Sequence, residues 1–281
     1  MSRDNLLRIG FLLSIFVALA VGCARKSGTG VTPASAPPAK VEKASLMVFA
    51  GAANKPPLTE LCQDFEKANN CVVNVTFAGS GMLLTQITTE KVGDVYVPGS
   101  DDFMQKGKEK GAIDAASERL VAWLVPVINV AKGNPKGIKG LEDLAKPGVK
   151  VCLADAKAVC LGAVADQILQ AAGLEERVKK NVVTYALSCE EVENRVETGE
   201  VDAAIGWDVF DHWAPEKIEN VPIPKVARRY ISAAVVAFSS QKELAQKFVD
   251  FVSSSQGNAV YSKYGYTVPV SGEAVPANLG K

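Results

Sequence analysis

Short apolar segments alternate with amphipathic segments along most of this chain, and this alternation restricts the fold more than any other feature of the sequence. Residues 46–50 form a continuous apolar run, residues 56–68 repeat apolar side chains at helical spacing, and residues 71–77 alternate apolar with polar. These patterns predict a strand, a helix and a strand. The same order recurs up to about residue 110 and again between residues 149 and 206. We therefore expect an α/β fold in which helices cover the sheets.

A late strand, expected at residues 231–238, follows the second run of alternating segments, and two helices follow it at about 242–252 and 254–264. Two α/β units with a late return segment predict two lobes with a cleft between them, which is a good place to close on a small ligand. In such sheets ligands bind beyond the carboxyl ends of strands. The segments 51–55 and 79–81 are expected there.

The first 43 residues differ from the rest of the chain. Arg3 and Arg8 precede an uncharged, mostly apolar run at residues 9–22, which is shorter than the roughly 20 residues of a transmembrane helix. Small residues before Cys23 resemble the cleavage motif of bacterial lipoproteins. We therefore expect a lipoprotein signal peptide at residues 1–22. The alternative is an ordinary signal peptide with an incidental cysteine.

Cys23 is followed by a segment rich in Ala, Pro, Ser and Gly. Such a segment has too few large apolar residues to build a core, so we expect lipidated Cys23 and a flexible tether at residues 23–43. The predicted protein is exported and anchored to a membrane by its lipid, with the folded part facing the periplasm or the cell exterior.

The charge balance and the single histidine exclude several classes of function. Lys and Arg total 31, and Asp and Glu also total 31, so the chain lacks the basic excess of a dedicated nucleic-acid binder. His212 is the only histidine, which argues against histidine metal sites and against a Ser-His-Asp or Cys-His enzyme. Acidic pairs such as Asp101-Asp102 are expected to be solvated helix starts. The sequence predicts no catalytic residue, no metal site and no cofactor.

Six segments, in this order, resemble the periplasmic substrate-binding proteins of the molybdate and tungstate type, which are the receptors of ABC importers. They are LMVFAGAANKPPLTELCQDFEKANN, VTFAGSGMLLTQI, GDVYVPGSDDFM, KGNPKGIKGLEDLAKPGVKVCLAD, VETGEVDAAIGW and AQKFVDFVSSSQGNAVYSKYGY. The resemblance covers about residues 45–266. It implies the two-lobed type II binding-protein fold, with mixed sheets and two chain crossovers. Lobe one is then expected at residues 44–125 plus 226–281, and lobe two at residues 126–225.

In the family that the chain resembles, hydroxyls and backbone N–H groups at helix N-termini hold a tetrahedral oxyanion between the lobes, and no cationic side chain is needed. Carried over by position, the resemblance implies a ligand site at Ala53, Asn54, Ser80, Gly81, Cys160, Leu161, Cys189 and Trp207. Ala53 replaces the serine of the family's first loop, so Asn54 is expected to supply amide donors instead. Ser80 matches the second loop, and Trp207 replaces a tyrosine.

Five cysteines remain when Cys23 is set aside. An exported chain meets an oxidising environment, so disulfides are possible. We expect one bridge between Cys62 and Cys71 and one between Cys160 and Cys189 at the cleft, with Cys152 as a buried free thiol. Alternatively, Cys160 and Cys189 remain thiols and bind a thiophilic metal or arsenite.

The function predicted from the sequence is capture of a small oxyanion, most readily molybdate or tungstate, for an ABC permease and its ATPase. Sulfate or a phosphorylated small acid is the nearest alternative ligand. A surface sensor or adhesin that kept the fold without transport is the alternative class of function. An enzyme is disfavoured because no nucleophile–base pair or phosphate-binding loop is present. A monomer is expected.

Overall fold

The computed structural model describes residues 43–277 of the chain, and its main feature is a pair of five-stranded mixed sheets. The predicted signal peptide, Cys23 and all of the predicted tether except Lys43 lie outside the described residues. Among the residues described, no helix is long and apolar enough to cross a membrane.

The first sheet has the strand order β2-β1-β3-β10-β4. In it, β1 pairs in parallel with β2 and β3, whereas β10 runs antiparallel to β3 and β4. The strands are β1 Ser45–Gly51, β2 Val72–Ala78, β3 Val95–Val97, β4 Arg119–Leu124 and β10 Arg229–Val235. The associated helices are η1 Ala52–Asn54, α1 Lys55–Asn69, α2 Ser80–Glu90, α3 Asp101–Glu109, η2 Ala115–Ser117, α8 Lys242–Val252 and α9 Ser255–Lys263. We call this sheet with its helices lobe one.

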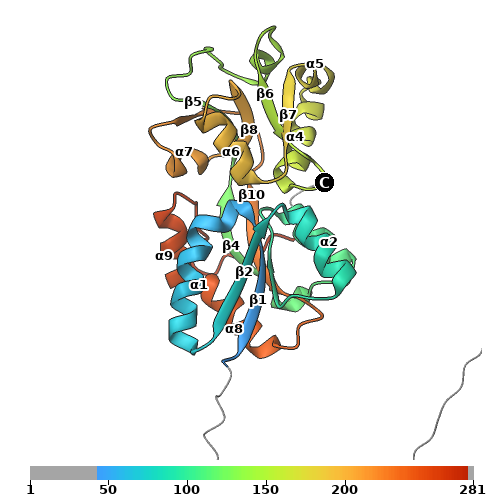
Figure 1. Cartoon of the computed structure of the whole chain (residues 1–281), viewed down its shortest axis with the longest axis vertical. Helices are drawn as coiled ribbons and strands as arrows, with labels where there is room; N and C mark the ends of the chain where they lie inside the picture. The colour runs from blue at the N-terminus through green and yellow to red at the C-terminus, as the bar shows by residue number, and fades with distance from the viewer. Residues whose placement is uncertain (1–42, 278–281) are drawn as a thin grey trace, which may run out of the picture. The chain divides into compact units, whose positions relative to one another are not determined.

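The second sheet has the order β7-β6-β8-β5-β9 and makes up, with its helices, what we call lobe two. Here β6 is parallel to β7 and β8, and β5 is antiparallel to β8 and β9. The strands are β5 Pro126–Ala131, β6 Val151–Ala154, β7 Val182–Ala186, β8 Ala203–Trp207 and β9 Ile218–Pro222. The helices are η3 Leu141–Ala145, α4 Cys160–Ala171, α5 Glu175–Lys179, α6 Cys189–Glu197 and α7 Phe210–Trp213. Figure 1 shows lobe one in the lower half and lobe two in the upper half.

The chain passes between the sheets twice. Only Val125 separates β4 of the first sheet from β5 of the second, and residues 223–228 lead back from β9 to β10. The first passage is held to the end of β8, because the Val125 N–H donates to Asp208 Oδ1 at 3.0 Å and the Asp208 N–H donates to the Val125 carbonyl at 2.9 Å. Burial raises the pKa of Asp208 to about 6.

Local sequence explains where the helices that border the cleft begin and end. Pro56 and Pro57 occupy the first turn of α1, where a missing N–H costs nothing, and Asn70 ends the helix in the left-handed conformation with φ of 49°. Phe65 of α1 packs edge-to-face on Phe248 of α8, with ring centroids 5.0 Å apart. This packing fixes α1 on the first sheet, so the loop before it is held at the sheet edge.

The expected alternation of strands and helices is confirmed, and the fold class is the α/β fold of two mixed sheets that the sequence predicted. The elements that periodicity missed are short or continuously apolar, namely β4, β5, β9, α5 and α7. β4 and β5 are almost entirely buried, so they lack the alternation that marks a half-exposed strand.

Candidate functional site

Ser80 is the first residue of α2 and lies at the carboxyl edge of the first sheet, as the sequence predicts. Gly79, rather than Ser80, occupies the N-cap position. The Ser80 side chain accepts a hydrogen bond from the Gly99 N–H at 3.0 Å, and the Tyr96 hydroxyl donates to the Ser80 carbonyl at 2.8 Å. A serine hydroxyl that accepts one bond still has a proton to donate, and the N–H groups of a first helical turn have no intrahelical partner. Ser80 therefore retains donors for an anion.

The loops that meet around Ser80 approach one another so closely that they require glycine. A Cβ on Gly51 would lie 2.6 Å from the Gly99 nitrogen and 2.8 Å from Ser80 Oγ. A Cβ on Gly99 would lie 2.9 Å from Cys160 Sγ and 3.5 Å from Ala53 Cβ. The structure thus brings Ala53 and Ser80 of lobe one against Cys160 of lobe two.

Lobe two contributes two helix N-termini to the region around Ser80. Cys160 is the first residue of α4 and Cys189 the first residue of α6. The hydrogen bond with the neighbouring Cys189 thiol, together with burial, raises the pKa of Cys160 well above its ordinary value, so Cys160 stays a protonated thiol at neutral pH unless a ligand removes the proton. The Leu161 N–H lies in the first turn of α4, which leaves it without an intrahelical partner.

The expected disulfides are absent from the structure. Cys62, Cys71, Cys160 and Cys189 are free, buried thiols, as is Cys152. The Cys62–Cys71 prediction rested on a shared face in the sequence pattern, and the Cys160–Cys189 prediction on family positions at the cleft edge. These side chains pack instead as small apolar groups, each at most 5% exposed. Burial raises the pKa of Cys62 to about 12, so this thiol is inert toward exchange.

A thiol titration tests this correction. In the full chain carrying Cys23→Ser, we expect five thiols to react with Ellman's reagent after denaturation, and almost none in the folded protein. Reaction of only three thiols, or of one, in the denatured protein would show that one or both bridges form.

Asn54 does not present its amide to the cleft, contrary to the expectation from the sequence. Its Nδ2 lies 3.2 Å from the carbonyl oxygens of Gly51 and Val97, and its Oδ1 accepts from the Tyr261 hydroxyl at 2.9 Å. The side chain is fully buried. Asn54 therefore ties the loop after β1 to the end of β3.

Trp207 ends β8 and is fully buried. Its carbonyl accepts a hydrogen bond from Asn129 Nδ2 at 3.2 Å, but its indole Nε1 has no hydrogen-bond partner among the described residues. A buried donor without a partner costs free energy, so this N–H is a group that a ligand can satisfy.

The cleft is closed over the predicted ligand residues. The Gly81 N–H of α2 donates across it to the Ala158 carbonyl at 2.9 Å, and Lys55 Nζ lies 2.7 Å from Glu190 Oε1. All eight predicted ligand residues are buried. An anion can therefore enter only when the lobes separate.

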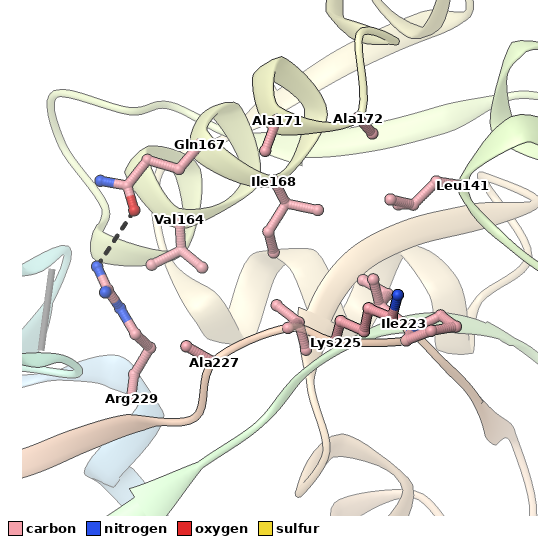
Figure 2. A pocket seen from close by; sticks show the side chains of 12 residues that line it. Leu141, Val164, Gln167, Ile168, Ala171, Ala172, Ile223, Lys225, Ala227 and Arg229 are labelled. Atoms are coloured by element: carbon pink, nitrogen blue, oxygen red, sulfur yellow. Dashed lines mark hydrogen bonds between the residues drawn. The ribbon is translucent and has the colours of Figure 1, made fainter. Parts of the chain in front are cut away.

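The pocket drawn in Figure 2 lies elsewhere, between α4 and the passage 223–228. It measures about 400 Å³, has apolar walls that include Val164 and Ile168, and none of the predicted ligand residues lines it. At its edge Arg229 donates to Gln167 Oε1 at 3.4 Å, and Arg229 Nε lies 3.3 Å from Asp101 Oδ1. Asp101 is 6% exposed, so the expectation that it is a solvated helix start is wrong.

Several residues at the site were missed by the sequence analysis. Gly99 supplies the N–H that holds Ser80, Tyr96 holds the Ser80 carbonyl, and the fully buried Ser100 hydrogen-bonds Asp102. Lys106 Nζ, 3.5 Å from Asp102, partly balances that charge. The available signal was the glycine that ends β1, at position 51, and the glycine shortly after β3, at position 99, because close backbone approach needs glycine.

Comparison with known proteins gives consistent results. The profile of bacterial extracellular solute-binding proteins matches residues 46–267. The molybdate-binding protein ModA of Mycobacterium tuberculosis H37Rv is 31% identical over 267 residues, covering 94% of this chain and 98% of that protein.

Solved structures share the fold at lower identity. The periplasmic molybdate-binding protein of Azotobacter vinelandii has a TM-score of 0.68 at 18% identity, covering 80% of this chain and 100% of that one. The sulfate-binding protein SubI of M. tuberculosis H37Rv has a TM-score of 0.70 at 17% identity, covering 79% and 86%.

Proposed function

Because the chain belongs to the bacterial extracellular solute-binding proteins, we propose that it captures a tetrahedral oxyanion between its two lobes, with molybdate or tungstate as the preferred ligand. The observation that carries the proposal is that Ser80 at the start of α2 and Cys160 at the start of α4 both lie against Gly99, with Cys189 at the start of α6 beside Cys160. Helix N-termini offer unpaired N–H groups and partial positive charge, which suit a divalent oxyanion without a cationic side chain.

The family membership confirms the resemblance noted in the sequence. It also makes the chain a solute-binding protein rather than an enzyme. The relatives named for molybdate and sulfate support an inorganic oxyanion as the ligand, and delivery to an ABC permease with its ATPase follows from the same relationship.

In the proposed complex, opening of the lobes breaks the bond between the Gly81 N–H and the Ala158 carbonyl, and an oxygen of the anion replaces that carbonyl as the acceptor. The Ser80 hydroxyl and the N–H groups of Leu161 and Cys189 supply further donors. The unpaired indole N–H of Trp207 replaces the hydroxyl of the family's tyrosine. Closure around the ligand follows because these donors come from both lobes and contact it together only when the cleft is shut.

The two sheets with their helices correspond, in this proposal, to lobes that move about Val125 and residues 223–228. Cys23 carries the lipid that keeps the monomeric receptor at the outer face of a membrane. A sensor without transport would use the same site, and adjacent permease and ATPase genes distinguish the two roles.

One observation favours a second candidate ligand. Cys160 and Cys189 are reduced and adjacent, and two thiols suit arsenite or a soft metal. Arsenite would condense with both thiols to form two As–S bonds, releasing two water molecules. Sulfate or a phosphorylated small acid remains an alternative for the helix N-termini alone.

Calorimetric titration of the full chain, without and then with reductant, tests the proposal. The ligands are molybdate, tungstate, sulfate, phosphate, 3-phosphoglycerate and arsenite. We expect tight molybdate or tungstate binding that is indifferent to reductant. No detectable binding of molybdate or tungstate, together with binding of another anion, would reject the preferred ligand. Arsenite binding that requires reductant would favour the thiol site.

Ser80→Ala removes the one hydroxyl that matches the family. We expect it to weaken molybdate binding by roughly 10- to 100-fold, since a hydrogen bond to a charged group contributes about 1.5–3 kcal/mol. Ser262→Ala, on the exposed side of α9, is the matched control and should leave the affinity unchanged. Equal affinities in the two variants would place the anion away from Ser80.

A further inference from the structure

A second pocket lies where the two lobes meet on the side of α1 and α6, and it measures about 450 Å³. Lobe one contributes Lys55 and Thr59 of α1, together with Tyr264 after α9. Lobe two contributes Glu193 of α6 and Trp213 of α7. The pocket is separate from the predicted anion site, because none of the eight residues assigned to that site lines it.

Glu193 is the unusual residue of this pocket. It is only 7% exposed, and its carboxylate has no hydrogen bond or salt bridge to any residue that the structure describes. Burial, together with the charges of Glu197 and Glu190, raises the pKa of Glu193 from 4.5 to about 7. The nearby cation is already engaged, because Lys55 Nζ lies 2.7 Å from Glu190 Oε1.

A buried carboxylate without a partner is costly, and the native state normally compensates such a group. A metal ion is a poor partner here, because no group of three metal-ligating side chains exists among the described residues. The pocket walls point to a different cation. Trp213, Tyr264 and Pro56 line the pocket, and aromatic and apolar walls are the environment that binds alkylammonium groups.

We propose that this pocket is a binding site for a small organic cation, whose ammonium group pairs with Glu193 and whose alkyl part contacts Trp213 and Tyr264. The carboxylate supplies the charge that the ligand requires, and the aromatic rings replace the water that an alkylammonium ion loses.

The position of the pocket gives the cation a role in closure. Its walls come from both lobes, so the complete pocket exists only when the cleft is shut. A ligand that binds the closed state stabilises it, and by linkage it raises the affinity of any other ligand of that state. This coupling rests on the proposed oxyanion function, whereas cation binding itself does not.

Titration of the full chain with ethylammonium chloride at about pH 8, without any oxyanion, tests the site directly, with sodium chloride as the ionic-strength control. We expect saturable binding to the unaltered chain and at least a tenfold loss in Glu193→Gln. Glu176→Gln, an exposed carboxylate on α5, is the matched control and should bind like the unaltered chain. No saturable binding, or equal binding by Glu193→Gln, would overturn the proposal.

The pH profile provides a second readout that does not depend on a variant. Ethylammonium pairs with the ionised form of Glu193, so its affinity should rise as pH increases through about 7. The other titratable groups that line the pocket are Lys55, Glu190 and Tyr264, and Glu197 acts on Glu193 through its charge. His212 of α7 precedes the pocket residue Trp213 and packs on Gly265, so the same pH profile measured in Glu193→Gln is the control for its titration. An affinity that is flat with pH contradicts the assignment.

Molybdate titrations with and without ethylammonium then separate the two proposals. Tighter molybdate binding in the presence of the cation supports the coupling. If molybdate does not bind at all while ethylammonium does, the oxyanion function fails and the cation site stands.

Discussion

Gly79→Ala should hold the cleft partly open and lower the affinity for the oxyanion by about 100-fold, or about 2.7 kcal/mol. A Cβ at this position would lie 2.8 Å from the Leu187 carbonyl oxygen and closer still to that of Ala158, both in lobe two. These atoms belong to the backbone and cannot move aside as a flexible side chain would. The φ and ψ of Gly79, −62° and 135°, are ordinary for alanine, so lobe one itself should fold without strain.

Calorimetry gives the affinity, and small-angle X-ray scattering of the anion-bound protein reports closure. Gly140→Ala is the matched control, because its backbone is extended and its nearest neighbour, Glu142 Oε2, lies at 3.4 Å. The control should bind as the unaltered chain does. A Gly79→Ala protein that binds tightly and closes fully would mean that the contact between Gly79 and lobe two is not part of the bound state.

Arg229→Met should destabilise the fold by about 3 kcal/mol near pH 8, since it leaves a buried carboxylate unpaired. Arg229 and Asp101 are each 6% exposed, and Arg229 Nε lies 3.3 Å from Asp101 Oδ1. Burial raises the pKa of Asp101 to about 6, although Arg229 opposes this shift. Without Arg229 the pKa rises further, so the carboxyl is neutral near pH 5 and most of the loss should disappear there.

Urea denaturation at the two pH values measures this effect. The sign follows from linkage: a carboxyl whose folded-state pKa is raised favours the folded state at low pH, and this contribution declines as pH rises through the folded-state pKa. The double variant Asp101→Asn/Arg229→Met removes both charges and should recover most of the stability at about pH 8. If Arg229→Met lowers the free energy of unfolding equally at both pH values, the lost packing of Arg229, rather than the unpaired carboxylate, causes the destabilisation.

Local periodicity was sufficient to predict much of this fold, because α1, β2 and α6 are amphipathic or half-exposed and carry their burial pattern in the sequence. It was insufficient for β4 and β5, which are buried on both faces and separated by one residue. The pairing of Asp101 with Arg229 joins residues from distant segments, and nothing in either segment indicates the other.

The candidate site was predicted in part. The sequence and the family resemblance identified Ala53, Ser80 and Cys160, which the structure brings together around Gly99. The hydrogen bond from Asn54 to the Val97 carbonyl of β3 was not predicted, because it depends on strand pairing that a single segment does not reveal. The sequence also did not reveal that the cysteines remain free thiols, since two cysteines on facing elements can pack together without forming a disulfide.

The central claim is that an oxyanion binds where α2, α4 and α6 begin. Anomalous diffraction from crystals of the protein grown with tungstate tests it most directly, because tungsten can be located independently of the protein. We predict a single strong peak within hydrogen-bonding distance of Ser80 Oγ and the first-turn N–H groups of α4 and α6. A peak in the pocket beside Arg229 and Lys225, or no peak at all, would contradict the account.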